Sequence, residues 1–338
     1  MLSFRAKLRC KRLGKGLLLV LIAGLILWLL WMIWLQRYLV FTREGVSLDF
    51  DRSTKLLEGQ EPAQPQPEET ATIQLIYDHD TDLEQQQGLT AILGWYADTG
   101  MLLDGVAPVA QALSQAGPDT AVMLDVKSKF GNYYYSTALT GAGTSDSIDI
   151  AAMDQLIQNL SKSGCYLIAR LPALRDSAFA EANQESGLAL SSGALWTDDE
   201  KCYWLNPNSD VVHSNLVQIC RELQKLGFDE VVFTDFRIPD SGSIVFQADA
   251  TKDEVLKQAA RRLVEACAST GFAVSFQGGL DFPMPQGQSR LFLADMEPEQ
   301  VADAAEKAPV MDASTQLVFL TASRDTRYDA FSVLRAIH

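Results

Sequence analysis

The stretch Leu226-Gly-Phe-Asp-Glu-Val-Val-Phe-Thr-Asp-Phe-Arg-Ile-Pro239 decides the fold of this chain. Gly227 is typical of a helix end, the apolar run after it predicts a short buried strand, and Pro239 cannot continue a sheet ladder. In a parallel β/α fold, polar groups at the carboxyl end of a strand face the functional site. The stretch therefore predicts a β/α fold with Asp235 and Arg237 near that site.

The same alternation of strand and helix continues along residues 72–338. Strands are predicted at 73–77, 89–96, 121–127, 165–170, 230–235, 272–277, 291–294 and 316–321, and helices at 105–115, 151–163, 210–225, 252–269, 297–307 and 327–337. Thr251, followed three positions later by Glu254, predicts the cap of the helix at 252–269. Strands that are apolar on both faces and alternate with helices indicate a parallel sheet. Eight strands predict a (β/α)8 barrel of the TIM type in the α/β class, irregular in its carboxyl-terminal third. An incomplete barrel or an open sheet is the alternative, because the first and seventh strands are weak.

The amino-terminal region has the pattern of a membrane anchor. Residues 17–35 carry no charge and are long enough to span a bilayer as one transmembrane helix. Residues 1–16 hold six basic and no acidic residues, which predicts a cytoplasmic amino terminus and an extracytoplasmic main domain. A cleaved signal peptide is the alternative, but no small-x-small cleavage site follows the apolar run. Residues 36–71, rich in Pro, Glu and Gln from Glu58 to Glu69, predict an extended stalk.

The net charge and the cysteine content indicate which kinds of ligand the main domain can bind. The chain has a net charge of −15, and once the six positive charges of residues 1–35 are set aside the remainder stands at −21. Such acidity disfavours nucleic acid and anionic lipid as ligands of the main domain, whereas neutral glycans remain compatible. Five cysteines without a Cys-x-x-Cys pair, together with three histidines, indicate neither a zinc site nor another metal centre. The four cysteines after the anchor are expected as buried thiols or as one or two disulfides.

Several charged side chains are expected at the mouth of the barrel. Asp125 and Lys127 are two positions apart on one strand, so they point to the same side, either into the mouth or into an internal ion pair. Arg170 ends the next strand, where an arginine is more often a structural partner than a ligand-binding group. Hydrolysis of a glycoside usually needs two carboxylates, for which Asp125 and Asp235 are the best-placed candidates.

Other acidic and aromatic residues are weaker candidates for the site. Glu230 begins its strand and is therefore expected at the opposite end of the barrel, while Asp281 and Asp295 are reserve carboxylates. The segment from Leu195 to Pro207 is unusually aromatic for a loop. Its Trp196, Tyr203 and Trp204 are expected either to stack on a sugar ring or to form a hydrophobic lid.

Four blocks in order resemble a known family. They are Val122-Met-Leu-Asp-Val-Lys127 with Gly131 after it, Tyr166-Leu-Ile-Ala-Arg170, the loop from Trp196 to Pro207, and the stretch from Leu226 to Pro239. Together they resemble a bacterial glycosyl hydrolase domain of unknown function, a TIM barrel related to the α-amylase-like superfamily. The resemblance covers about residues 88–280. It implies a carboxylate mechanism on a glycan, with Asp125, Lys127, Arg170 and Arg237 at positions that match the family pattern.

One block departs from the family pattern. The family's strand-end aspartate falls on Thr234, and Asp235 takes the position of a tyrosine. A shift of one residue along a strand turns a carboxylate to the opposite face, unless a β-bulge returns it to the site. Residues 281–338 also lack an equivalent of the family's later strand end.

Two functions are therefore expected from the sequence. In the first, the chain is a membrane-anchored extracytoplasmic glycoside hydrolase, with Asp235 and Asp125 catalytic and Lys127, Arg170, Trp196, Trp204 and Arg237 binding a glycan of the cell envelope or the environment. In the second, the barrel is catalytically degenerate and binds a glycan or an envelope protein without hydrolysis. Neither needs a cofactor or a metal ion, and neither involves nucleic acid.

Overall fold

The computed structural model describes residues 39–42, 45–48, 89–246, 250–268 and 271–337. The chain divides into two compact units, residues 1–81 and residues 82–338. In the first unit, β1 (Leu39–Thr42) and β2 (Gly45–Leu48) form an antiparallel hairpin. The anchor predicted at 17–35, most of the stalk and the strand predicted at 73–77 lie outside the described residues. Within them, no helix has the length and apolar character needed to cross a membrane.

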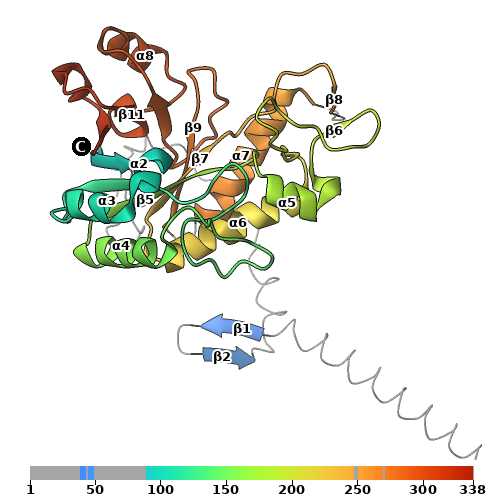
Figure 1. The fold of residues 1–338 in the computed structure, drawn as a ribbon, viewed down its shortest axis with the longest axis horizontal. Helices are drawn as coiled ribbons and strands as arrows, with labels where there is room; N and C mark the ends of the chain where they lie inside the picture. Colours follow the sequence, from blue (N-terminus) through green and yellow to red (C-terminus); the bar gives the residue numbers. More distant parts are fainter. Residues whose placement is uncertain (1–38, 43–44, 49–88, 247–249, 269–270, 338) are drawn as a thin grey trace, which may run out of the picture. The chain divides into compact units, whose positions relative to one another are not determined.

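The second unit is a closed barrel of eight parallel strands (Figure 1). The strands follow one another around the barrel in chain order, and β12 pairs with β3 to close it. They are β3 (Leu93–Ala97), β4 (Ala121–Asp125), β5 (Tyr166–Pro172), β7 (Glu230–Thr234), β9 (Ala273–Gln277), β10 (Leu291–Ala294), β11 (Leu317–Thr321) and β12 (Ser332–Ala336). The closed barrel confirms the predicted fold class and replaces the alternatives of an open sheet or an incomplete barrel.

The helices cover the outside of this barrel (Figure 1). They are α2 (Thr99–Asp104), α3 (Val106–Ala112), α4 (Ile150–Ser163), α5 (Ser177–Ala182), α6 (Asp210–Lys225), α7 (Lys252–Ala268), α8 (Val301–Lys307) and α9 (Ala313–Gln316). A two-stranded antiparallel sheet of β6 (Ala189–Leu190) and β8 (Ile244–Val245) lies apart from the barrel strands. The Thr251 hydroxyl accepts a hydrogen bond from the Glu254 N–H at 3.3 Å, as the predicted cap requires.

The carboxyl-terminal third is irregular, and one predicted element there is wrong. Residues 327–337, predicted as a helix, form the end of the 3-10 helix η4 (Thr326–Tyr328) and then β12. No helix separates β9 from β10. The error has a physical cause: a short apolar run fits a buried strand and a helix equally well until its partners are known. Here the unpaired edges of β11 and β3 supply those partners.

Gly227 shows why the quoted stretch folds as it does. It follows α6 with a φ of 93°, a left-handed conformation that favours glycine. A Cβ atom at this position would meet the Ser161 Oγ of α4 at 2.1 Å, so the residue also permits a close approach between the two helices. Gly227 therefore ends α6, allows the backbone there to approach Ser161 of α4, and leads into the buried strand β7 that precedes Asp235.

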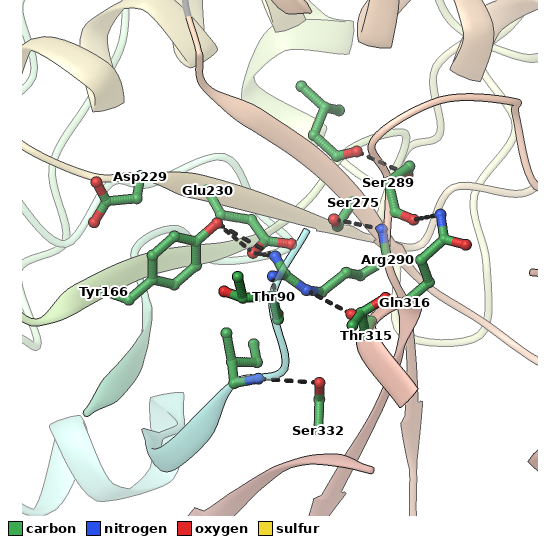
Figure 2. A network of polar contacts seen from close by, with 12 residues as sticks. Thr90, Tyr166, Asp229, Glu230, Ser275, Ser289, Arg290, Thr315, Gln316 and Ser332 are labelled. Atoms are coloured by element: carbon green, nitrogen blue, oxygen red, sulfur yellow. Dashed lines mark hydrogen bonds and ion pairs between the residues drawn. The ribbon is translucent and has the colours of Figure 1, made fainter. Parts of the chain in front are cut away.

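The amino-terminal end of the barrel is filled by a buried polar network (Figure 2). Arg290, 1% exposed, donates to Glu230 Oε2 at 2.5 Å and to the Tyr166 hydroxyl at 3.3 Å. Its remaining N–H groups reach the carbonyl oxygens of Thr90 and Thr315. Because a buried charge is costly unless it is paired and hydrogen-bonded, these contacts fix the registers of five chain segments at this end. Glu230 lies far from the functional end of its strand, as the sequence predicts.

Candidate active site

The carboxyl ends of the strands enclose a cavity of about 840 Å³. Strands β4, β5, β7, β9 and β10 each contribute residues within their last three positions, and these include Asp125, Arg170, Thr234, Gln277 and Ala294. Active sites of TIM barrels lie at this end of the fold. The cavity is therefore the candidate active site, and Asp125, Arg170 and Asp235 line it together.

A long loop between β4 and α4 builds the outer wall of the cavity. The loop residues that line it are Lys127, Ser128, Lys129, Phe130, Asn132, Tyr134, Ser145 and Ser147. Phe130 has 45% of its surface exposed, and Leu103 of α2, also at the wall, has 52% exposed. Large apolar side chains that stay exposed beside a polar cavity are candidates for contact with a ligand. Sequence analysis did not single out Phe130 or Tyr134, although a long aromatic loop directly after a barrel strand is a usable signal.

Asp125 is held by four hydrogen bonds. Arg170 donates from Nε to Oδ1 at 2.5 Å and from Nη2 to Oδ2 at 3.1 Å. Thr99 donates to Oδ2 from its backbone N–H at 2.7 Å and from its hydroxyl at 2.8 Å. A carboxylate offers about four acceptor positions, so these contacts occupy Asp125 fully. In this arrangement Asp125 orients Arg170 and the start of α2, and has no acceptor position left for a ligand.

Arg170 links Asp125 to the floor of the cavity. Its Nη1 donates to the Gln277 Oε1 of β9 at 3.4 Å, and its guanidinium lies 6.0 Å from the centre of the Tyr96 ring. On the other side of Asp125, the Tyr134 and Thr99 hydroxyls are 3.4 Å apart. These contacts form a connected network across the four strands β3, β4, β5 and β9, helix α2 and the wall loop, which fixes the shape of the cavity.

Asp235 reaches the cavity through a turn of the backbone. It directly follows β7 and has a φ of 51°, a left-handed conformation that is uncommon for residues other than glycine but tolerated by aspartate. Thr234 and Asp235 consequently both line the cavity, whereas strict alternation would place them on opposite faces. The Asp235 carboxylate is therefore at the site although it is shifted by one residue relative to the family pattern. The left-handed backbone conformation of Asp235 accounts for this placement.

The surroundings of Asp235 favour its protonated form. The side chain is half-buried, and this burial raises the pKa of its carboxyl above the usual range. Arg175 and Arg237, together with a hydrogen bond from Thr234, act in the opposite direction but do not cancel the effect of burial. A carboxyl group with a raised pKa beside a cavity is suited to donate a proton. By its placement, Asp235 is the better candidate of the two for an acid.

Two residues predicted to contact the substrate, Lys127 and Trp204, have buried side chains that bind other residues of the protein. Lys127 contributes to the lining of the cavity, but its ammonium is buried and forms an ion pair with Asp176, so the internal pair expected with Asp125 is not formed. Trp204 is 1% exposed, and its indole N–H donates to Asp198 Oδ2 at 2.9 Å. Its ring is packed in the core and offers no face to a sugar, so the prediction for Trp204 is wrong.

Two further candidates, Trp196 and Arg237, do not line the cavity. Trp196 is partly buried and donates from its indole N–H to the Ser243 hydroxyl at 3.1 Å. Arg237 is exposed, with its guanidinium 5.0 Å from the centre of the Trp204 ring. Their roles in binding a substrate stay predictions. The reserve carboxylates Asp281 and Asp295 are exposed and are absent from the lining of the cavity.

No group of three or more His, Cys, Asp or Glu residues in the described part of the chain is placed to hold a metal ion. The side chains that line the cavity include one half-buried carboxyl, one paired carboxylate, an arginine, two lysines and several hydroxyl and amide groups.

A known protein family matches the part of the chain that supplies three of the cavity residues. The family described as "Putative glycosyl hydrolase domain" matches residues 112–272, a range that contains β4, β5 and β7 with Asp125, Arg170 and Asp235. No curated protein matches the chain in sequence.

Solved structures of glycosidases share the fold. The GH20 exo-β-N-acetylglucosaminidase from Vibrio harveyi, in complex with N-acetylglucosamine, superposes with a TM-score of 0.52 and 7% identity over 73% of this chain and 50% of that one. The β-N-acetylhexosaminidase from Bacteroides fragilis gives a TM-score of 0.50 and 9% identity, covering 69% of this chain and 50% of that one. This chain thus spans half the length of either enzyme, and identities this low show the barrel alone. The resemblance predicted from the sequence is confirmed: residues 112–272 match the glycosyl hydrolase domain family, within a barrel of the kind that GH20 enzymes contain.

Proposed function

We propose that this chain hydrolyses a glycosidic bond at the mouth of the barrel, with Asp235 as the general acid. The observation that carries the proposal is the placement of Asp235, whose carboxyl lines the cavity and whose pKa is raised by burial. An acid with a raised pKa stays protonated closer to neutral pH and can therefore protonate the leaving oxygen of a glycoside.

The wall of the cavity suits a sugar ring. The ring of Phe130 is exposed at the wall, and the C–H face of a pyranose packs on an aromatic ring. Asn132, Gln277, Ser145 and Ser147 supply donors and acceptors for sugar hydroxyls around it. An exposed aromatic platform with amide and hydroxyl groups nearby supports a neutral glycan as the ligand, which is compatible with the acidity of the chain.

A second function is favoured by the state of Asp125. Both common glycosidase mechanisms need a second carboxylate as nucleophile or base. The second carboxylate that lines the cavity is Asp125, and its oxygens already accept four hydrogen bonds. This arrangement supports a barrel that binds a glycan, or an envelope protein, without cleaving it.

The place of action is also a proposal. The uncharged run at 17–35, preceded by six basic residues, supports a single-pass membrane protein with its barrel outside the cytoplasm. The substrate would then be a polysaccharide of the cell envelope or of the environment.

The two functions are separated by comparing the wild-type chain with D235N. Full-length protein is incubated with a panel of cell-wall, plant and N-acetylhexosamine-containing glycans, and released reducing ends and bound ligand are both measured. Turnover that is lost in D235N while binding remains supports hydrolysis. Saturable binding without product in the wild type supports the second function. Absence of both product and binding across the panel contradicts hydrolysis and glycan binding, and leaves an envelope protein as the ligand.

D281N is the matched control for this comparison. Asp281 is an exposed carboxylate outside the lining of the cavity, so D281N makes the same substitution as D235N but leaves the site intact. Turnover that falls equally in D281N and D235N would indicate an effect of charge on the whole protein and would remove Asp235 from the acid role.

A further inference from the structure

Phe130 is the middle residue of a turn at residues 128–132, here called the Phe130 turn. The Ser128 N–H donates to the Asn132 carbonyl oxygen at 2.9 Å, and the Asn132 N–H donates to the Ser128 hydroxyl at 3.1 Å. The Gly131 N–H donates to the Ser128 carbonyl oxygen at 3.0 Å. These hydrogen bonds close the turn on itself, but they do not fix where it lies relative to the barrel. The place of the Phe130 ring at the cavity wall therefore depends on contacts outside the turn.

A buried ion pair joins the Phe130 turn to α5. Lys127 directly precedes the turn, and its ammonium pairs with Asp176, the N-cap residue of α5. The two side chains are 0% and 4% exposed. The same ammonium lies 5.4 Å from the centre of the ring of Tyr133, which directly follows the turn and forms an antiparallel bridge with Lys127. Lys127 thus connects the residues on either side of the Phe130 turn with the start of α5.

The backbone of the Phe130 turn also lies against the start of α5. The Ala178 N–H donates to the Phe130 carbonyl oxygen at 3.0 Å, and Asp176 Oδ1 caps the helix by accepting from the Phe179 N–H at 3.0 Å. Gly131 has a φ of 96°, and a Cβ atom there would clash with Asp176 Oδ1 and meet the Ala178 Cβ at 2.7 Å. The turn is therefore packed closely on the residues that Asp176 holds in place.

A second ion pair reaches the Phe130 turn from the protein surface. Lys129 pairs with Glu200, and their side chains are 32% and 55% exposed. An exposed ion pair stabilises little, because solvent screens it, whereas a buried charge that loses its partner is costly. The pair of Lys127 and Asp176 is therefore the stronger of the two connections.

We propose that Lys127 and Asp176 are positioning residues of the candidate active site: their buried ion pair seats the Phe130 turn on α5 and keeps the Phe130 ring at the cavity wall. Neither side chain contacts the ligand in this role, and both act through Phe130. The effect on ligand binding rests on the function proposed above, in which this ring packs on a sugar, but the seating of the turn does not. Lys127, predicted from the sequence to bind the substrate, then serves binding indirectly.

The first test needs no ligand. Hydrogen exchange is measured by mass spectrometry in full-length wild type and in K127M, on peptides that contain residues 128–132 and 176–179. Slow exchange of the Gly131 and Ala178 amides is expected in the wild type, and exchange roughly 10-fold faster in K127M, with β11 and β12 unchanged as internal controls. Exchange of the Ala178 amide at the rate of an unprotected amide in the wild type would overturn the proposal, as would unchanged exchange in K127M. The wild-type measurement stands even where K127M fails to fold.

The second test separates positioning from a general effect on stability. Binding of cellotetraose and of chitotetraose is measured by isothermal titration calorimetry. K127M should bind roughly 5- to 10-fold more weakly, the loss expected for F130A, and F130A/K127M should bind no more weakly than F130A, because both changes remove the same platform. R290M is the matched control, since it removes the cation of another buried pair, at the opposite end of the barrel, and should keep the wild-type affinity. Additive losses in F130A/K127M, or an equal loss in R290M, would show a structural role alone and overturn the proposal.

Failure of the proposed function gives a different result. If neither tetrasaccharide binds to the wild type, binding of these glycans is contradicted, and hydrogen exchange alone decides whether Lys127 seats the Phe130 turn. If a tetrasaccharide binds equally well to F130A and to the wild type, the ring is not a platform for it and the proposed positioning role is overturned.

Discussion

Thr234 and Asp235 are consecutive residues, and both line the cavity at the mouth of the barrel. The left-handed backbone at Asp235, with its φ of 51°, turns the second side chain back toward the side that the first already faces. This relationship lets the chain keep a carboxylate at the site although the family's aspartate position holds a threonine. It also makes the identity of residue 235 matter for the backbone as well as for chemistry.

Replacement of Asp235 by Asn is expected to leave the fold intact and to stabilise it at neutral pH. Asparagine tolerates the left-handed conformation, so the backbone keeps its turn. Because burial raises the pKa of Asp235, the stability contributed by its protonated form is complete below the unfolded-state pKa of about 3.9 and is lost as pH rises through the folded-state pKa. Melting temperatures at pH 4 and pH 7 check this. D235N should match the wild type more closely at pH 4 and be at least as stable at pH 7. A D235N that is clearly less stable at pH 7 would refute the effect of burial.

The pair of Asp125 and Arg170 is expected to be strongly coupled. Their side chains are 13% and 15% exposed and joined by two hydrogen bonds, so a double-mutant cycle of D125N, R170Q and the double variant should give a coupling free energy of about 1–3 kcal/mol. Urea denaturation supplies the free energies of unfolding. The control cycle uses Arg261 and Glu265, an exposed pair on α7 that is expected to couple much more weakly, because solvent screens the two charges. Equal couplings in the two cycles would show that the cavity pair behaves as an ordinary surface pair.

Phe130 is expected to affect ligand binding without affecting stability. Since 45% of the side chain is exposed, F130A should change the free energy of unfolding by less than about 1 kcal/mol. Loss of the aromatic platform should weaken glycan binding roughly 5- to 10-fold, and F130W should restore it. Isothermal titration calorimetry with a glycan that binds the wild type measures both effects. M311A, which removes a side chain 92% exposed and absent from the cavity lining, is the control that should leave affinity unchanged.

The network of Glu230 and Arg290 is expected to contribute to stability alone. Removing one partner leaves a charge buried without its counter-ion, so E230M and R290M should each lower the free energy of unfolding by about 3–5 kcal/mol. The double variant E230M/R290M should recover much of this loss, because apolar side chains of similar volume can replace a buried pair. Chemical denaturation gives the free energies, and ligand affinity at the mouth should stay at the wild-type value in any variant that folds. A double variant with the full sum of the single losses would contradict this account.

The sequence predicted the barrel better than it predicted the site. Helix α6 was placed at its observed bounds, and seven of the eight predicted strands overlap barrel strands because long buried runs alternate clearly with helices. The strand β12 was missed, since its short apolar run has no pattern of its own and is defined by pairing with β11 and β3.

Site residues were predictable where position along a strand decides placement. Asp125, Arg170 and Asp235 all follow from the ends of β4, β5 and β7. The burial of Trp204 depends on how one loop packs against Asp198 and two arginines, which no spacing in the sequence encodes. The wall residue Phe130 likewise becomes a candidate only once the path of its loop is known.

The buried network that fills the amino-terminal end of the barrel affects how a ligand enters and leaves the cavity. Arg290 and Glu230 close that end of the barrel. In the described part of the chain, a ligand therefore reaches the cavity through the mouth at the carboxyl ends of the strands. A bound ligand must leave through the same opening by which the next ligand enters. Release of one ligand and entry of the next would therefore compete for the same opening, where Phe130 is exposed at the wall.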